Sequence, residues 1–127
     1  MPTSDEYFEI YEQLIGYVPP KIKERVQLGL EVDPVTLDII ENVRKICMYN
    51  DVFDIKTSQM MLFGILLGQV SPASEFHASA ARRAGATKKE MHAIAGLAFL
   101  FRGLPAFNLG AEIINKVYAD DVSGAAR

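Results

Sequence analysis

The side chains best suited to acid–base chemistry in this sequence stand three residues apart: Ser71, Ser74 and His77. Residues at that interval share one face of a helix, so two hydroxyls and an imidazole would lie together. An imidazole exchanges a proton near neutral pH, and hydroxyls can hold a substrate by hydrogen bonds. The pattern predicts a small proton-transfer site. The alternative is a structural histidine bonded to a backbone carbonyl, with Ser71 serving as a helix cap.

Gln59 lies on the preceding predicted helix, about one helix length upstream of this patch. If the two helices fold back on each other, Gln59 and Ser71 lie at opposite ends of the earlier helix. We therefore expect that a neighbouring helix or another subunit is needed to bring Gln59 and Ser71 together.

Two cations are candidates for holding a substrate carboxylate. Arg102 follows the apolar run 97–101, and a guanidinium matches a carboxylate in a two-point geometry. The alternative for Arg102 is a helix-terminal cation that the helix dipole stabilises. Lys56 lies in the first turn of its predicted helix, where the dipole disfavours a cation, so it indicates a further partner such as an ion pair.

Composition excludes several classes of function. Over 127 residues, 13 basic and 16 acidic side chains give a net charge of −3, which argues against a nucleic-acid-binding face or a polybasic membrane anchor. The one cysteine, Cys47, cannot form an intramolecular disulfide, and two histidines leave little room for a metal site. We expect no metal or cofactor, no nucleic-acid or membrane partner, and a soluble cytoplasmic protein without a signal peptide.

Capping residues and apolar periodicity predict an all-α domain over residues 1–127, with about seven helices and a frayed tail at 120–127. In the third helix we expect Leu37, Ile40, Val43 and Cys47 to form a buried stripe. The predicted helices cover about 3–15, 20–30, 34–49, 54–70, 71–84, 87–102 and 105–118.

The segment Met60–Val70 is apolar on every side. A helix of this kind must be enclosed all round, so we expect part of its surface to lie at a subunit contact. The two most apolar helices, around 58–70 and 91–102, are expected to form a central antiparallel pair with the His77 helix between them.

Five short segments follow one another in a characteristic order and spacing. They are Asp54-Ile55-Lys56-Thr57, Glu75-Phe76-His77, Arg83-Ala84-Gly85-Ala86-Thr87, Glu90-Met91 and Gly103-Leu104-Pro105-Ala106. Together they resemble the carboxymuconolactone decarboxylase family, whose superfamily includes the alkylhydroperoxidase D proteins. The likeness covers roughly residues 10–118. It implies an all-α fold, an obligate homo-oligomer (trimer or hexamer) and a site between helices near a subunit boundary.

The resemblance also shows where this chain departs from the peroxidase members, which carry a glutamate, then CxxC, then a histidine. His77 matches the histidine, whereas the CxxC region reads Val-Ser-Pro-Ala-Ser over 70–74 and the glutamate position falls on Ser58 or Gln59. Without thiols there is no sulfenate and no resolving cysteine, so cysteine-dependent peroxidase activity is excluded. In the thiol-free branch, the helix after the second capping box often carries a glutamate, where this chain has Ala93.

The thiol-free branch implies a cofactor-free decarboxylase, or a related lyase or isomerase, for a small unsaturated carboxylic acid or lactone resembling 4-carboxymuconolactone. His77 would be the general acid or base, with Gln59, Ser71 and Ser74 as hydrogen-bonding partners. Arg102, Lys56 and Ser58 would bind the substrate. The alternative is a non-catalytic small-molecule-binding or scaffold subunit of the same fold.

Overall fold

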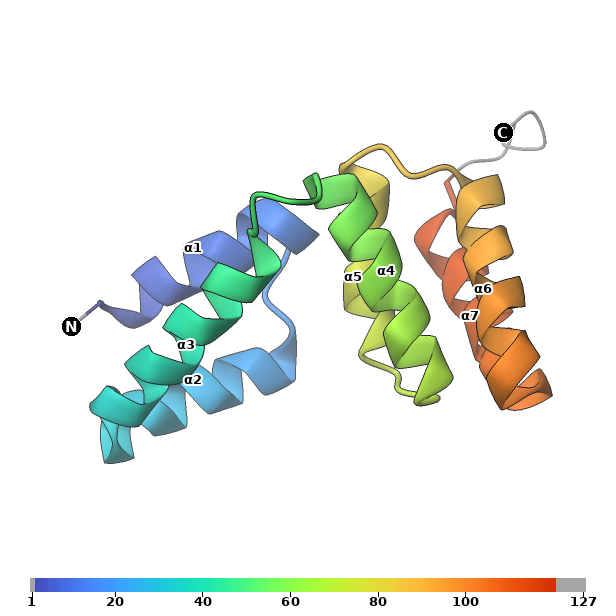
Figure 1. Ribbon diagram of the computed structural model, residues 1–127. Coiled ribbons are helices and arrows are strands. Elements are labelled where there is room, and N and C mark those ends of the chain that lie inside the picture. The colour runs from blue at the N-terminus through green and yellow to red at the C-terminus, as the bar shows by residue number, and fades with distance from the viewer. Residues whose placement is uncertain (1, 121–127) are drawn as a thin grey trace. The chain divides into compact units, whose positions relative to one another are not determined.

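The computed structural model describes residues 2–120, and within that range every regular element is an α-helix (Figure 1). The prediction of an all-α chain of about seven helices is confirmed, while the predicted tail beyond Asp120 lies outside the described residues. The helices are α1 (Ser4–Ile15), α2 (Pro20–Val32), α3 (Pro34–Met48), α4 (Ile55–Gly68), α5 (Ser74–Arg83), α6 (Lys88–Arg102) and α7 (Leu104–Val117).

The chain divides into two compact units. The N-terminal unit, Met1–Phe53, contains α1 to α3, and the C-terminal unit, Asp54–Arg127, contains α4 to α7. The expectation of one domain over residues 1–127 stays a prediction. None of the helices within residues 2–120 is long and apolar enough to cross a bilayer.

Four helices begin at the capping residues that the sequence indicates. The side chains of Thr3, Asp33, Asp54 and Thr87 each accept a hydrogen bond from the backbone N–H three residues on. At Thr87 the box is complete, because the Glu90 carboxylate accepts from the Thr87 N–H at 2.9 Å. These bonds satisfy donors that a helix start leaves without a partner, which fixes where each helix begins.

The fifth helix begins later than predicted. The sequence indicates a cap at Ser71, but α5 starts at Ser74 and has no side-chain cap. Val70 adopts a left-handed backbone with φ of 51°, and the Ser71 N–H donates to the Leu66 carbonyl at 3.0 Å. Ser71 therefore closes the end of α4 instead of opening α5.

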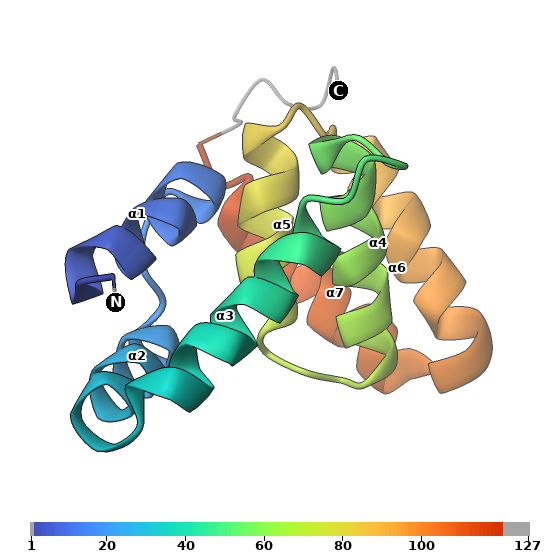
Figure 2. The same cartoon turned by 60° about the vertical axis from the view of Figure 1, so that its left-hand side comes forward.

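The C-terminal unit is built from two antiparallel hairpins, α4–α5 and α6–α7. The ribbon colours show α4 and α6 running in the same direction and α5 and α7 in the opposite one (Figures 1 and 2). The ion pair between Lys56 and Glu90 joins the first turns of α4 and α6, which agrees with a parallel arrangement. The expected antiparallel pairing of these two helices is wrong, because each is antiparallel to its own sequence neighbour.

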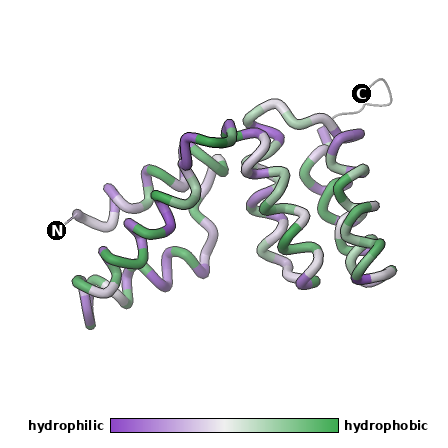
Figure 3. Tube along the Cα trace, in the orientation of Figure 1, coloured by the Kyte–Doolittle hydropathy of each residue, from purple (hydrophilic) through white to green (hydrophobic). Residues whose placement is uncertain are grey.

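An apolar core holds these four helices together. Phe63, Leu67, Met91 and Ala95 are completely buried within it. At Gly110 on α7, an added Cβ would lie 2.9 Å from the Cβ of Ala95, so α6 and α7 approach closely there. The concentration of hydrophobic residues along α4, α6 and α7 is visible in Figure 3.

The apolar segment Met60–Val70 is not enclosed by the chain itself. Phe63 and Leu67 are fully buried, but Met61 and Ile65 are 47% and 55% exposed. The helix therefore contributes one face to the core and leaves another uncovered. The predicted subunit contact on that face stays a prediction.

In the N-terminal unit, the buried face of α3 is not the one that we predicted. Leu37 is buried as expected, but Ile40, Val43 and Cys47 are exposed. The inner face of α3 instead carries Leu37, Glu41 and Arg44, at positions i, i+4 and i+7. The predicted stripe is wrong beyond Leu37, because the charged residues Glu41 and Arg44 take the positions of the inner face that follow it.

Candidate functional site

His77 on α5 and Gln59 on α4 form the polar contact of greatest chemical interest. The His77 Nδ1 and the Gln59 Oε1 are 2.7 Å apart, and Gln59 is completely buried. An amide oxygen only accepts hydrogen bonds, so Nδ1 of the neutral ring carries the proton and donates it to Gln59. Nε2 is then the basic nitrogen of His77.

The packing of α4 against α5 brings these two residues together. Gln59 lies just after the first turn of α4, and His77 lies at the end of the first turn of α5. The expectation that a neighbouring helix or another subunit brings Gln59 and Ser71 together stays a prediction, whereas Gln59 and His77 are in contact. Direct contact between the two helices is sufficient for the latter pair.

The two serines shape the turn before α5. The buried Ser74 hydroxyl donates to the Ser71 carbonyl at 2.6 Å, and the Ser71 Oγ accepts from the Ala73 N–H at 3.2 Å. Ser71 precedes the helix, so the predicted single helix face shared by Ser71, Ser74 and His77 does not form. These bonds fix the chain that leads into the His77 helix.

Ser58, next to Gln59 in the sequence, is the unusual hydroxyl of this region. The side chain is 8% exposed, and its Oγ has no hydrogen-bond partner within the part of the chain that the structure describes. Burying a hydroxyl without a partner costs roughly 1–3 kcal/mol, so such a group calls for an explanation.

Lys56 and Arg102 lie elsewhere, on an open groove between α4 and α6. The groove has a volume of about 730 Å³, and its apolar wall includes Met61, Ile65 and Leu97. Neither His77 nor Gln59 lines it. The candidate residues therefore fall into two places, with His77 and Gln59 at the α4–α5 contact and the two cations on the α4–α6 groove.

The Lys56 end of this groove is acidic as well as basic. Lys56 forms an ion pair with Glu90 at 3.1 Å. This is the kind of partner that we predicted for a cation in the first turn of a helix. The backbone hydrogen bond from Thr87, with Lys56 beside it, lowers the pKa of Glu90, and a hydrogen bond from Thr57 lowers the pKa of Asp54. Arg102 is exposed on the last turn of α6, as either interpretation of it requires.

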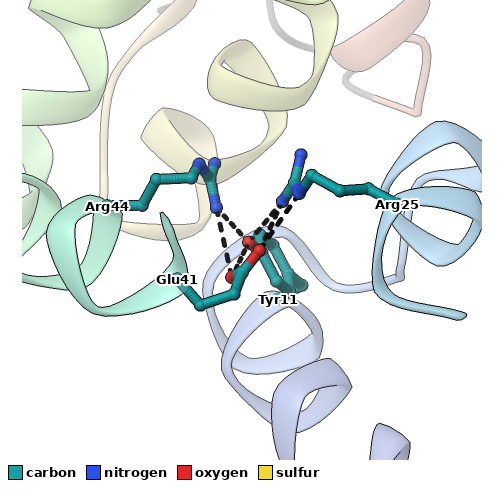
Figure 4. A network of polar contacts seen from close by, with 4 residues as sticks. All are labelled: Tyr11, Arg25, Glu41 and Arg44. Carbon is teal, nitrogen blue, oxygen red and sulfur yellow. Dashed lines mark hydrogen bonds and ion pairs between the residues drawn. The ribbon is translucent and has the colours of Figure 1, made fainter. Parts of the chain in front are cut away.

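A second, partly exposed polar centre joins the helices of the N-terminal unit, and the sequence analysis missed it. Figure 4 shows Tyr11, Arg25, Glu41 and Arg44 meeting at one point. The Tyr11 hydroxyl donates to the Glu41 Oε2 at 2.5 Å and accepts from Arg25 at 2.8 Å and from Arg44. Arg25 also pairs with Glu41 at 2.9 Å. One residue of α1, one of α2 and two of α3 are joined in this way.

This centre borders a small cavity of about 220 Å³, which Tyr7, Asp38 and Lys45 also line. Burial raises the pKa of Tyr11 to about 12, with the Glu41 hydrogen bond adding to the rise and Arg44 opposing it. Burial and a hydrogen bond to Asp38 raise the pKa of Tyr7 to about 12 as well. Both phenols are therefore neutral hydrogen-bond donors at physiological pH.

The one signal for this network in the sequence is a pair of charges, Glu41 and Arg44, on the face of α3 that also carries Leu37. Across residues 2–120, no group of three or more His, Cys, Asp or Glu side chains is placed to hold a metal ion.

The fold is similar to that of a known structure along nearly its whole length. A 1.65 Å crystal structure from Burkholderia xenovorans LB400, described as a "putative carboxymuconolactone decarboxylase", matches with a TM-score of 0.76. The match covers 98% of each chain at 22% sequence identity. At this level of identity it shows a carboxymuconolactone decarboxylase-like fold, in agreement with the resemblance of the sequence. No protein-family model and no curated protein matches the sequence.

Proposed function

We propose that this protein is a cytoplasmic, cofactor-free lyase of the decarboxylase type, acting on a small unsaturated carboxylic acid or lactone. The observation that supports the proposal is the 2.7 Å contact between His77 Nδ1 and Gln59 Oε1. The likeness to a structure described as a decarboxylase directs the choice among acid–base reactions. Isomerisation and lactone opening use the same parts.

In the proposed reaction, the bond between the substrate's carboxyl carbon and its neighbour breaks, and carbon dioxide leaves. The electron pair passes into the adjoining unsaturated carbonyl as a dienolate, so that no external electron acceptor is needed. His77, protonated on both nitrogens, then delivers the Nε2 proton to carbon, and the ring regains a proton from water. Gln59 holds the ring through Nδ1 and orients Nε2.

We propose different roles for the other candidates. Ser71 and Ser74 support the turn that leads to His77. We propose that the buried Ser58 hydroxyl hydrogen-bonds a substrate oxygen, since it has no partner among the described residues. Arg102 and Lys56 line a surface that does not include His77, so the proposed proton transfer does not depend on them.

The direct test is turnover of 4-carboxymuconolactone, followed by release of carbon dioxide, in matched histidine variants. His77→Ala should lower kcat by about 10²–10⁴-fold, the usual contribution of a general acid. His92→Ala is the control, because His92 lies exposed on α6 and makes an edge-to-face contact with Phe107. Undiminished turnover in a folded His77→Ala variant would eliminate His77 as the acid. Ser58→Ala should raise KM while leaving the fold intact.

The second candidate is a small-molecule-binding subunit without catalysis. The α4–α6 groove favours it, because about 730 Å³ lies within the usual range for ligand pockets. In this case the protein would bind apolar carboxylic acids without converting them, and Leu97→Arg would weaken binding while His77→Ala would not.

Assembly into a homo-oligomer, as a trimer or hexamer, is also proposed. The exposed apolar side chains of the groove support it, since Leu97 is 64% and Phe101 95% exposed. Contiguous apolar patches on soluble proteins commonly mark contacts with another molecule. Light scattering on the purified chain measures the assembly directly.

A further inference from the structure

The cavity of about 220 Å³ in the N-terminal unit is lined by α1, α3 and the residues that adjoin them. Ile10, Leu14 and Met48 give the cavity an apolar wall. Its volume lies below the usual range of about 300–1,000 Å³ for the pockets of drug-sized ligands. The cavity therefore suits a small molecule that has an apolar body.

Three carboxylates also line the cavity, and they belong to Glu6, Asp38 and Glu41. Asp38 accepts hydrogen bonds from Tyr7 at 2.9 Å and from Asn42 at 3.1 Å, so both of its oxygens have donors. Glu6 is exposed in the first turn of α1 and accepts from the Thr3 hydroxyl at 3.3 Å. Because the protein itself supplies these donors, the two carboxylates do not require a cationic ligand.

The third carboxylate, that of Glu41, lies among cations. Glu41 pairs with Arg25 at 2.9 Å and with Arg44 at 3.6 Å, as Figure 4 shows. Lys45 follows Arg44 in the sequence and lines the same cavity. Three cations against one carboxylate give this part of the N-terminal unit an excess of positive charge, which favours an anionic ligand.

The hydrogen-bonding groups that remain for a ligand are donors. The Lys45 side chain and the Tyr49 hydroxyl make no hydrogen bond or ion pair with any residue that the structure describes. Both contacts of Arg44, with Tyr11 and with Glu41, use Nη1, so the other N–H groups of the guanidinium remain. Burial raises the pKa of Tyr49 and the charge of Arg44 opposes the rise, which indicates that the guanidinium lies near this phenol.

We propose that this cavity binds a small carboxylic acid with an apolar body. Arg44 and Lys45 hold the carboxylate, and Tyr49 donates a further hydrogen bond to it. Ile10 and Leu14 contact the apolar body. An inorganic anion such as sulfate is the weaker ligand, because it would leave the apolar wall in water. The inference is independent of the proposed catalytic function, whose residues belong to the C-terminal unit.

The first experiment titrates the full chain with benzoate and follows the backbone amides by NMR. We expect saturable binding with a dissociation constant of about 1 mM or lower, and shifts at the amides of α1 and α3. Benzyl alcohol has the same ring without the charge and should bind about tenfold more weakly. Weaker binding of benzoate, equal affinity for benzyl alcohol, or shifts confined to α4 and α6 would overturn the proposal.

Removal of the Lys45 charge tests how the carboxylate is held. Lys45→Met should weaken benzoate binding by about tenfold, because it removes a cation and keeps an unbranched apolar side chain. The fold should persist, since the ammonium has no partner among the described residues. Lys23→Met is the matched control, because Lys23 is exposed on α2 and does not line the cavity. Equal affinity for benzoate in the two variants would contradict the role of Lys45.

Filling the cavity tests where the acid binds. Ile10→Trp should abolish measurable binding of benzoate, because the indole occupies the space beside Leu14. Val35→Trp is the control for the added ring, since Val35 is 59% exposed on α3, and circular dichroism checks the fold of both variants. Tyr49→Phe adds no bulk and should weaken binding by about fivefold. Parent-like affinity in folded Ile10→Trp or in Tyr49→Phe would exclude this cavity as the site.

Discussion

The helices of the two units are held together by different kinds of side chain. In the C-terminal unit, α4 to α7 enclose Phe63, Leu67 and Met91, all fully buried. In the N-terminal unit, aliphatic side chains such as Val26 and Leu37 are buried, and a partly exposed network of a phenol, a carboxylate and two guanidinium groups also joins α1, α2 and α3. The first interior is apolar and the second contains a network of charged hydrogen bonds.

The difference determines what each unit offers to other molecules. In the C-terminal unit, the buried amide of Gln59 lies against His77 and orients its imidazole ring. In the N-terminal unit, charged side chains take the inner face of α3, so the aliphatic side chains of that helix lie on the outside. One unit therefore provides a candidate site for chemistry, and the other has an exposed aliphatic face on α3.

Phe63→Ala is expected to have the largest effect on stability. Removing a fully buried phenyl ring leaves a cavity, and the free energy of unfolding should fall by about 3–5 kcal/mol. Urea denaturation followed by circular dichroism measures the change. Phe101→Ala is the control, since Phe101 is 95% exposed and its loss should change stability by less than about 0.5 kcal/mol.

Glu41→Gln tests the polar interior in the same way. The substitution preserves shape but leaves two guanidinium groups without their carboxylate, and should cost about 2–3 kcal/mol. Tyrosine fluorescence is the suitable signal, because Tyr7, Tyr11, Tyr17 and Tyr49 all lie in the N-terminal unit and the chain has no tryptophan. Glu24→Gln, on the exposed face of α2, is the control.

The effect of salt on the two variants should also differ. The cost of Glu41→Gln should shrink at 1 M NaCl, because its partners are partly exposed and their charges are screened, whereas the cost of Phe63→Ala should not. Equal salt dependence of the two variants would mean that the interiors do not differ in kind.

A smaller effect is expected from alkaline pH. The folded pKa of Tyr11, about 12, exceeds its ordinary value of 10.0, so the folded state holds this proton more tightly than the unfolded state. This contribution is complete below pH 10 and is lost as the pH rises from about 10 to about 12. Tyr11→Phe should reduce the slope of stability against pH in that window. A slope identical to that of the parent would show that Tyr11 is not protected.

Local signals in the sequence were sufficient for the helices, and long-range contacts decided the rest. The caps at Thr3, Asp33, Asp54 and Thr87 depend on neighbours three residues away, so they are readable in the sequence. The start of α5 cannot be predicted from the local sequence, because Val70 adopts a left-handed conformation that its residue type disfavours.

The candidate site was predictable only in part, for the same reason. His77 and Gln59 were both identifiable as polar residues in apolar surroundings, but their contact depends on how α4 and α5 pair. The Tyr11 hydroxyl contacts arginines 14 and 33 positions away, and the pair of charges Glu41 and Arg44 on α3 is the one local signal for this network. Periodicity also predicted that the aliphatic stripe of α3 is buried. It cannot show that Glu41 and Arg44 bind Tyr11 and Arg25 on the neighbouring helices.

In the proposed reaction, Gln59 accepts the Nδ1 proton of His77, so that Nε2 is the nitrogen that exchanges protons. Nitrogen-15 NMR of the labelled imidazole measures this tautomer directly, in the parent protein and in Gln59→Leu. We expect His77 to be the Nδ1–H tautomer in the parent protein and to lose this tautomer in the folded Gln59→Leu variant. An Nε2–H tautomer in the parent, or the same tautomer with and without Gln59, would contradict it.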